Sequence, residues 1–253
     1  METDIIEIKY ALDTFYFLVC GALVMWMAAG FTMLESGLVR SKNTTEILTK
    51  NVALYAVSCV MYLLMGYTIM YGGSDGGILP DSWFGNSIAN ATAEEVLAGA
   101  AADASDYTYY SGASDFFFQV VFVATAMSIV SGAVAERMKL WSFLAFAVVM
   151  TGVIYPLQGM WKWGGGFLDS AGFLDFAGSG VVHMTGAAAA LAAVLLLGAR
   201  KGKYRADGSV NPIPGANMPM AALGMFILWV GWFGFNGGSE LKVSDIGEAN
   251  AVA

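Results

Sequence analysis

The residue of this sequence best suited to carry a proton near neutral pH is His183, the only histidine in the chain. An imidazole titrates near pH 6.5 and can pass a proton by donating from one ring nitrogen while accepting at the other. Its neighbours Val181, Val182 and Met184 are apolar, so a charged form would be costly there. Two interpretations remain open: a proton or substrate relay in a bundle core, or a neutral imidazole hydrogen-bonded to a neighbouring helix.

Aromatic rings and glycines alternate in two segments that could hold a small cation. Residues 161–167 read WKWGGGF, and residues 231–239 read GWFGFNGGS. Ring faces attract cations within about 6 Å, and glycine lets backbone approach closely. Aromatic rings at 118–122 (FQVVF) are expected at a similar depth. Asp175 could cap the helix that follows, which is the simpler reading, or stabilise a cation at the edge of a pore.

The elements that must position these residues are strongly apolar. Hydrophobic residues make up 57% of the chain and charged residues 13%, against roughly 25% charged in soluble domains. The low charge and the net charge of −8 argue against disorder and nucleic-acid binding. Cys20 and Cys59 offer no disulfide or metal-site spacing, no nucleophile–base pair is visible, and no cofactor or enzyme activity is expected. The remaining class is an integral membrane protein.

Six stretches without any Asp, Glu, Lys or Arg are long enough to span a bilayer. They are residues 14–34, 52–71, 116–135, 140–161, 176–199 and 218–236. Because they show no strand-like alternation, we predict an all-α polytopic membrane protein that forms one domain over residues 1–253. The fifth stretch is rich in Gly and Ala, which predicts that other helices surround it.

Basic residues predict the orientation. Nine of the 12 follow the first, third and fifth stretches: Arg40, Lys42, Lys50, Arg137, Lys139, Arg200, Lys201, Lys203 and Arg205. Positive residues stay on the cytoplasmic side, so we expect a multi-pass protein of the cell membrane with its N-terminus outside. The start of the chain is acidic, which is untypical of a cleaved signal peptide. Residues 72–115 would form an acidic extracytoplasmic loop, most simply a solvated one.

Six motifs in this order carry a family resemblance. They are ESGLVRSKN at 35–43, AER at 135–137, WGGG at 163–166, LDFAG at 174–178, VVH at 181–183 and GWFGFN at 231–236. Together they resemble the ammonium transporter family (the Amt/Mep/Rh group), and the Amt branch more than the Rh branch. The resemblance implies a helical bundle with inverted repeats and eleven spans, of which this chain would hold the first repeat plus the first helix of the second. We therefore expect the chain to be a fragment.

The resemblance also implies roles for particular residues. Trp163 and Ser239 are similar to an outer ammonium-recruitment site, with Phe118 and Gln119 at its entrance. Phe122 and Phe235 resemble a stacked phenyl gate. Asp175 resembles a buried carboxylate that supports ammonium binding without contacting the ion directly. His183 is similar to the first of two pore histidines, and Trp232 matches a tryptophan that lines the pore. No metal ligand is implied.

The implied function is transport of ammonium or ammonia across the bilayer, with a proton relay through the pore histidine. The alternative is an ammonium-sensing module fused to a cytoplasmic signalling domain. An unrelated membrane enzyme is the weakest hypothesis. Family members suggest a homotrimer and a cytoplasmic nitrogen-regulatory protein or fused signalling domain as partners.

Overall fold

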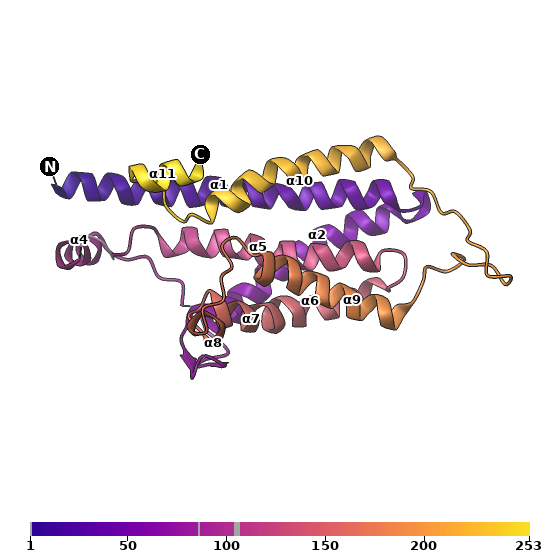
Figure 1. The fold of residues 1–253 in the computed structure, drawn as a ribbon, viewed down its shortest axis with the longest axis horizontal. Helices are drawn as coiled ribbons and strands as arrows, with labels where there is room; N and C mark the ends of the chain where they lie inside the picture. Colours follow the sequence, from indigo (N-terminus) through magenta and orange to yellow (C-terminus); the bar gives the residue numbers. More distant parts are fainter. Residues whose placement is uncertain (1, 86, 104–106) are drawn as a thin grey trace.

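The computed structural model of the protein describes residues 2–85, 87–103 and 107–253 (Figure 1). Within those residues, six helical segments are long and apolar enough to cross a membrane, and each overlaps one of the six charge-free stretches. They are α1 (Glu2–Leu38); η1 (Ser41–Asn43) with α2 (Thr44–Met61), η2 (Tyr62–Gly66) and α3 (Tyr67–Tyr71); α5 (Gly112–Val134); α6 (Leu140–Val149) with η3 (Met150–Ile154), α7 (Tyr155–Lys162) and α8 (Phe167–Ser170); η4 (Ser179–Met184) with α9 (Thr185–Leu197); and α10 (Met218–Gly238). The predicted all-α membrane fold is confirmed.

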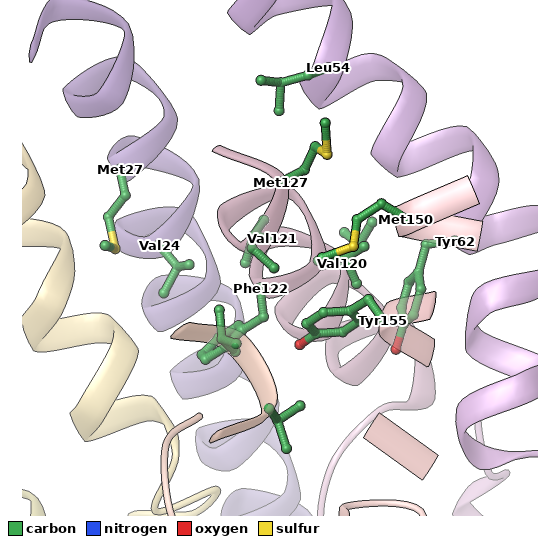
Figure 2. Packing of buried hydrophobic residues seen from close by; sticks show 14 of the residues in the cluster. Val24, Met27, Leu54, Tyr62, Val120, Val121, Phe122, Met127, Met150 and Tyr155 are labelled. Atoms are coloured by element: carbon green, nitrogen blue, oxygen red, sulfur yellow. The ribbon is translucent and has the colours of Figure 1, made fainter. Parts of the chain in front are cut away.

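Helix α5 lies at the centre of the molecule. In its most apolar 18-residue window 78% of the residues are buried, against 28% in the corresponding windows of the fifth and sixth segments. A helix that is hydrophobic all round needs neighbours on every side. Figure 2 shows that Val120, Val121 and Met127 of α5 pack between α1 and the helices that carry Leu54 and Tyr155. The core is therefore built around α5.

Helices α1 and α10, from opposite ends of the chain, run side by side over most of their length (Figure 1). Glycines of α10 make this close approach feasible. A Cβ on Gly224, Gly231 or Gly234 would overlap backbone or side-chain atoms of α1. In lipid, helices associate through such small-residue contacts because water exclusion does not hold them together.

The segment between α3 and α5 contains a short antiparallel hairpin, β1 (Ser74–Asp75) with β2 (Leu79–Pro80), and the helix α4 (Ala93–Ala102). Thr92 and Glu95 form a capping box at the start of α4. The segment differs from the expected solvated loop at its end, because α5 already begins at Gly112 and Asp115 is buried in it. Asp106, another of its predicted acidic residues, lies outside the described residues.

A buried carboxylate joins three of the loops at the far end of α5. The Glu136 side chain is fully buried and accepts hydrogen bonds from Arg40 and Asn43 before α2, and from Arg200 after α9. Burial on its own would raise the pKa of the Glu136 carboxyl, but the hydrogen bonds from these partners outweigh it and lower the pKa to about 2.

The fifth segment is less enclosed than its composition predicts. Within the described chain, α9 packs mainly on α5, with Gly186 and Ala190 buried. Leu195 and Leu196 on the same helix are 74% and 88% exposed. Within the described chain, helix packing thus covers only one face of this segment, and the prediction that other helices surround it stays a prediction. The α11 helix (Ile246–Val252) and the N-terminal half of α1 complete the molecule at the same end (Figure 1).

Candidate functional site

A cavity of about 440 Å³ lies where α3, α5, α7 and the end of α10 meet. We call it the vestibule. Six of the residues singled out in the sequence line it: Phe118, Gln119, Phe122, Trp163, Asp175 and Ser239. The first and last of them, Phe118 and Ser239, are more than 120 residues apart in the chain, so it is the fold that brings the six together. Lys162, which also lines the cavity, is paired with Asp169.

Two phenyl rings lie against each other at the inner side of the vestibule. The ring centroids of Phe122 and Phe235 are 4.2 Å apart with an interplanar angle of 34°. Each side chain is only 1% exposed. Trp163 stands edge-on to Phe122, with centroids 6.2 Å apart. The phenyl pair therefore closes the vestibule with apolar surface.

His183 lies directly behind the phenyl pair. Its ring centroid is 5.3 Å from that of Phe235, and its Nδ1 is 3.3 Å from the carbonyl oxygen of Gly178. The imidazole is exposed in the described chain, because α9 and η4 are covered on one face only. Vestibule, Phe122, Phe235 and His183 thus follow one another in a continuous line of contacts.

Asp175 acts as the cap of the π-helical turn η4. Its carboxylate accepts hydrogen bonds from the backbone N–H groups of Gly178, Gly180 and Val181 at 2.7–2.9 Å. Gly178 has a φ of +107°, which glycine adopts at little cost, and this lets the chain fold back onto the carboxylate. The simpler reading of Asp175, a helix cap, is confirmed, and the cap explains why the fifth segment begins at Ser179 and not at Phe176.

Trp163 and Ser239, which the sequence predicts to recruit ammonium, both line the vestibule. The indole N–H of Trp163 donates to the carbonyl oxygen of Asp175 at 3.0 Å, so the ring is fixed and offers its face and edge to a guest. The hydroxyl of Ser239 donates to the carbonyl oxygen of Phe235 at 2.8 Å. With its proton used in this way, the Ser239 oxygen keeps lone pairs that can accept an N–H group.

A second carboxylate, Asp115, lines the vestibule and was not singled out in the sequence. It is 7% exposed and accepts hydrogen bonds from the Tyr67 hydroxyl at 2.6 Å and the Gln119 amide at 3.4 Å. Tyr71 and Tyr110 add further aromatic surface. The signal was present, because residues 115, 119 and 122 recur at i, i+4 and i+7 and therefore share a helix face.

The family follows from comparison with known proteins. The sequence model of the Ammonium Transporter Family matches residues 15–253. The chain belongs to the ammonium transporter family.

Similar proteins that are named as ammonium transporters support the same family. The chain is 44% identical over 245 residues to ammonium transporter Amt2 of Archaeoglobus fulgidus, with 92% of this chain and 48% of that protein covered. It is 43% identical over 241 residues to a putative ammonium transporter of Synechocystis sp., with 94% and 51% covered. The chain thus spans about half the length of the curated relatives it matches.

Solved structures of the family share the fold. One titled "Sensor Amt Protein" superimposes with a TM-score of 0.83 at 34% identity, covering 97% of this chain and 58% of that one. The crystal structure of Candida albicans Mep2 gives a TM-score of 0.76 at 26% identity, covering 94% and 50%. The arrangement of the six segments is therefore that of ammonium transporters.

Trp232 is the one family-implied residue that the structure does not bring to this line of contacts. It is 53% exposed and is not among the residues that border the vestibule in the described chain. It lies about one turn of α10 before Phe235, whereas the vestibule residue Ser239 comes about one turn after Phe235. Its role as a pore-lining residue stays a prediction.

Proposed function

We propose that the protein containing this chain moves ammonium or ammonia across a cell membrane, and that the vestibule is its outer entrance. The observation that carries the proposal is the continuous line from the vestibule through Phe122 and Phe235 to His183. A polar, aromatic cavity followed by an apolar closure and then an imidazole suits a guest that enters as a cation and then loses its charge.

Recruitment would use three kinds of contact. Ammonium has four N–H donors, and the oxygen of Ser239 can accept one of them. The ring of Trp163 attracts the cation, by about 2 kcal/mol or more once the site is desolvated. Asp115 supplies a negative charge at the edge of the same cavity, while the oxygens of Asp175 are engaged by backbone N–H groups.

Passage would separate the proton from ammonia. A charge is costly between the buried phenyl rings of Phe122 and Phe235, whereas neutral ammonia is tolerated. The proton that ammonium gives up would be taken by one ring nitrogen of His183 while the other nitrogen releases one, because a neutral imidazole has one acceptor and one donor nitrogen. The exposed face of His183 and α9 would be covered by the part of the protein that the relatives have and this chain does not, in line with pores built between inverted repeats. A homotrimer, with one pore per subunit, is part of the same proposal.

The test is the ammonium current of the intact protein in proteoliposomes. We expect a current in the wild type that discriminates against potassium. His183→Gln keeps a hydrogen-bonding side chain but cannot titrate, so it should abolish the ammonium current or admit potassium. An unaltered and selective current in a folded variant would reduce His183 to a packing residue.

A sensor is the second candidate, because the structure with the TM-score of 0.83 is titled as a sensor protein. For a sensor, the intact wild-type protein would bind ammonium without carrying a current. A current in the wild type would therefore decide for the transporter.

A further inference from the structure

Lys162 places a positive charge beside the vestibule, the cavity that recruits a cation in the proposed function. The other charged residues that border this cavity in the described chain are the carboxylates Asp115 and Asp175. A lysine ammonium group and a free ammonium ion carry the same charge, so Lys162 opposes the entry of the guest. Strong binding of a cation in the vestibule therefore requires a group that cancels the charge of Lys162.

The charge of Lys162 is close enough to act on a guest in the vestibule. A sphere of the cavity's volume of 440 Å³ would be about 9 Å across, which is close to the Debye length of about 8 Å at physiological ionic strength. The lysine stem has four carbons, so its ammonium lies within about 6 Å of the cavity wall. The Lys162 side chain is only 14% exposed, so water and salt screen its charge less than that of a surface lysine.

Asp169 is the group that cancels this charge. Its Oδ1 accepts a hydrogen bond from Nζ of Lys162, and the two form an ion pair. Unlike Lys162, Asp169 is not among the described residues that border the vestibule, and its side chain is 46% exposed. Asp169 therefore acts on a guest through Lys162 and not by contact.

The fold holds Asp169 opposite Lys162. Lys162 ends α7, and Asp169 lies in the short helix α8, which follows the turn at residues 163–166. The backbone N–H of Phe167, the first residue of α8, donates to the carbonyl oxygen of Gly77 in the β1–β2 hairpin at 3.0 Å. The hairpin thus anchors α8, so little of the chain has to be ordered for the ion pair to form.

We propose that the Lys162–Asp169 ion pair sets the affinity of the vestibule for ammonium, because Asp169 neutralises a lysine that would otherwise repel the ion. This inference rests on the proposed function. Loss of Asp169 would leave a positive charge that opposes the attraction by Asp115. Loss of Lys162 would leave the negative charge of Asp169 near the entrance without a counterion. The two single losses therefore change the affinity in opposite directions.

The experiment measures KM, the ammonium concentration at half-maximal current, for the intact protein in proteoliposomes. Asp169→Asn keeps the size of the side chain but removes its charge, so it should raise the KM about threefold. Lys162→Met keeps the length of the stem and should lower the KM about threefold. The double variant, like the wild type, has no net charge at the pair, so its KM should return to within about 1.5-fold of the wild-type value. The maximal current should stay within about twofold in all three variants.

Two control variants make the same changes of charge at exposed positions outside the vestibule. They are Asp75→Asn in the hairpin and Lys201→Met in the connection between α9 and α10. Because neither residue borders the cavity, both controls should keep the wild-type KM.

A wild-type KM in both single variants would overturn the proposal and leave the transport function standing. A KM raised in both single variants and in the double variant would also overturn it, because the pair would then only hold the turn that carries Trp163. If Lys162→Met does not fold, Lys162→Gln is measured in its place.

If the wild type carries no current, the transport function fails, and the ion pair is tested by binding alone. The measurement is then the ammonium concentration that gives half of the maximal rise in Tm of detergent-solubilised protein. The same order of the variants there supports the proposal. Any other order, or no rise in Tm with ammonium, overturns it.

Discussion

At the residue scale, two carboxylates line the vestibule, Asp115 and Asp175, and they differ in their hydrogen-bond partners. Asp175 uses both oxygens to accept three backbone N–H groups, so it holds the turn before His183 in place. Asp115 accepts from the Tyr67 hydroxyl and, at 3.4 Å, from the Gln119 amide. A carboxylate offers about four acceptor positions, so Asp115 retains capacity toward the cavity. In the proposed function, Asp115 would therefore attract the cation, whereas Asp175 holds the turn before His183.

Asp115→Asn should weaken ammonium recruitment without slowing passage. The amide can still accept from Tyr67, but the negative charge at the vestibule is lost. A charge in such a partly desolvated cavity is worth about 1.4 kcal/mol, which raises the KM for ammonium about tenfold. The maximal current should change less than about twofold. Concentration-dependent currents in proteoliposomes measure both quantities.

The matched control is Asp75→Asn, an exposed aspartate in the hairpin of the same connecting segment. It removes an equal charge outside the cavity and should leave the KM unchanged. An unchanged KM for Asp115→Asn as well would reduce Asp115 to a packing group that holds Tyr67.

Some residues of the site could be predicted from the sequence, and others could not. Trp163, Phe122 and Ser239 could be singled out because they lie in the aromatic- and glycine-containing segments 161–167, 118–122 and 231–239, and the structure brings them to one cavity. Asp115 was missed because the spans were delimited as charge-free stretches, and that criterion places every charged residue outside a helix. Asp115 is a buried carboxylate in the first turn of α5, so this criterion wrongly places it outside the helix. The pairing of Glu35 with Lys50 was equally invisible, because only the packing of α1 against α2 brings them together.

At the element scale, Glu136 fastens three connecting segments to one another. It sits at a φ of 62°, a left-handed conformation that is costly for a residue with a side chain. Its two oxygens accept from Arg40 and Asn43 on one side and from Arg200 on the other. The hydrogen bonds offset the strain and hold the segments before α2 and after α9 against the end of α5.

Glu136→Gln should destabilise the folded protein at neutral pH. The folded-state pKa of about 2 lies below the ordinary value of 4.5, so the carboxylate contributes stability above pH 4.5. That contribution, on the order of 2 kcal/mol, is lost as the pH falls from about 4.5 toward about 2. Thermal melts of detergent-solubilised protein should show a Tm about 4–8 °C lower for the variant at pH 7.

The difference in Tm between wild type and Glu136→Gln should shrink when the melts are repeated at pH 3. Glu46→Gln, at an exposed position in the first turn of α2, serves as the control and should leave the Tm unchanged. A difference that is equally large at pH 7 and pH 3 would show that the effect comes from side-chain shape and not from charge.

Helix positions were predictable from charge-free stretches, but helix surroundings were not. Hydrophobicity sets where a helix can lie in lipid, and all six segments obey it. The Gly- and Ala-rich composition of α9 correctly predicts a close approach, since Gly186 packs on α5, but it does not say how many faces are covered. Coverage depends on neighbouring elements, which no single stretch of sequence contains.

At the scale of the whole molecule, both ends of the chain lie in the same half of the molecule, and so does the end of α10 that leads to the vestibule residue Ser239 (Figure 1). The basic residues Lys201 and Arg205 lie in the long connection at the opposite end, between α9 and α10 (Figure 1). With positive residues on the cytoplasmic side, we predict that the vestibule faces outward. In the proposed function, this orientation places the vestibule where external ammonium would arrive.

Labelling with an impermeant thiol reagent on intact cells tests the orientation. Glu94→Cys in α4 should react, whereas Lys201→Cys should react only after the cells are opened. Both positions are exposed, and Glu95 is left unchanged because it belongs to the capping box of α4. The reverse pattern would invert the topology and turn the vestibule into a cytoplasmic opening.

The glycine-mediated contact between α1 and α10 also constrains the order of assembly during synthesis. Gly30 of α1 meets Gly224 of α10, which the ribosome adds about 190 residues later, or roughly 10–40 s at ordinary elongation rates. Throughout that interval the face of α1 that accepts α10 is in the bilayer without its permanent neighbour. Lipid tails or an insertion factor must occupy it and then be displaced when α10 enters. The last step of biogenesis for these six segments is thus the docking of α10 on the first helix to be made.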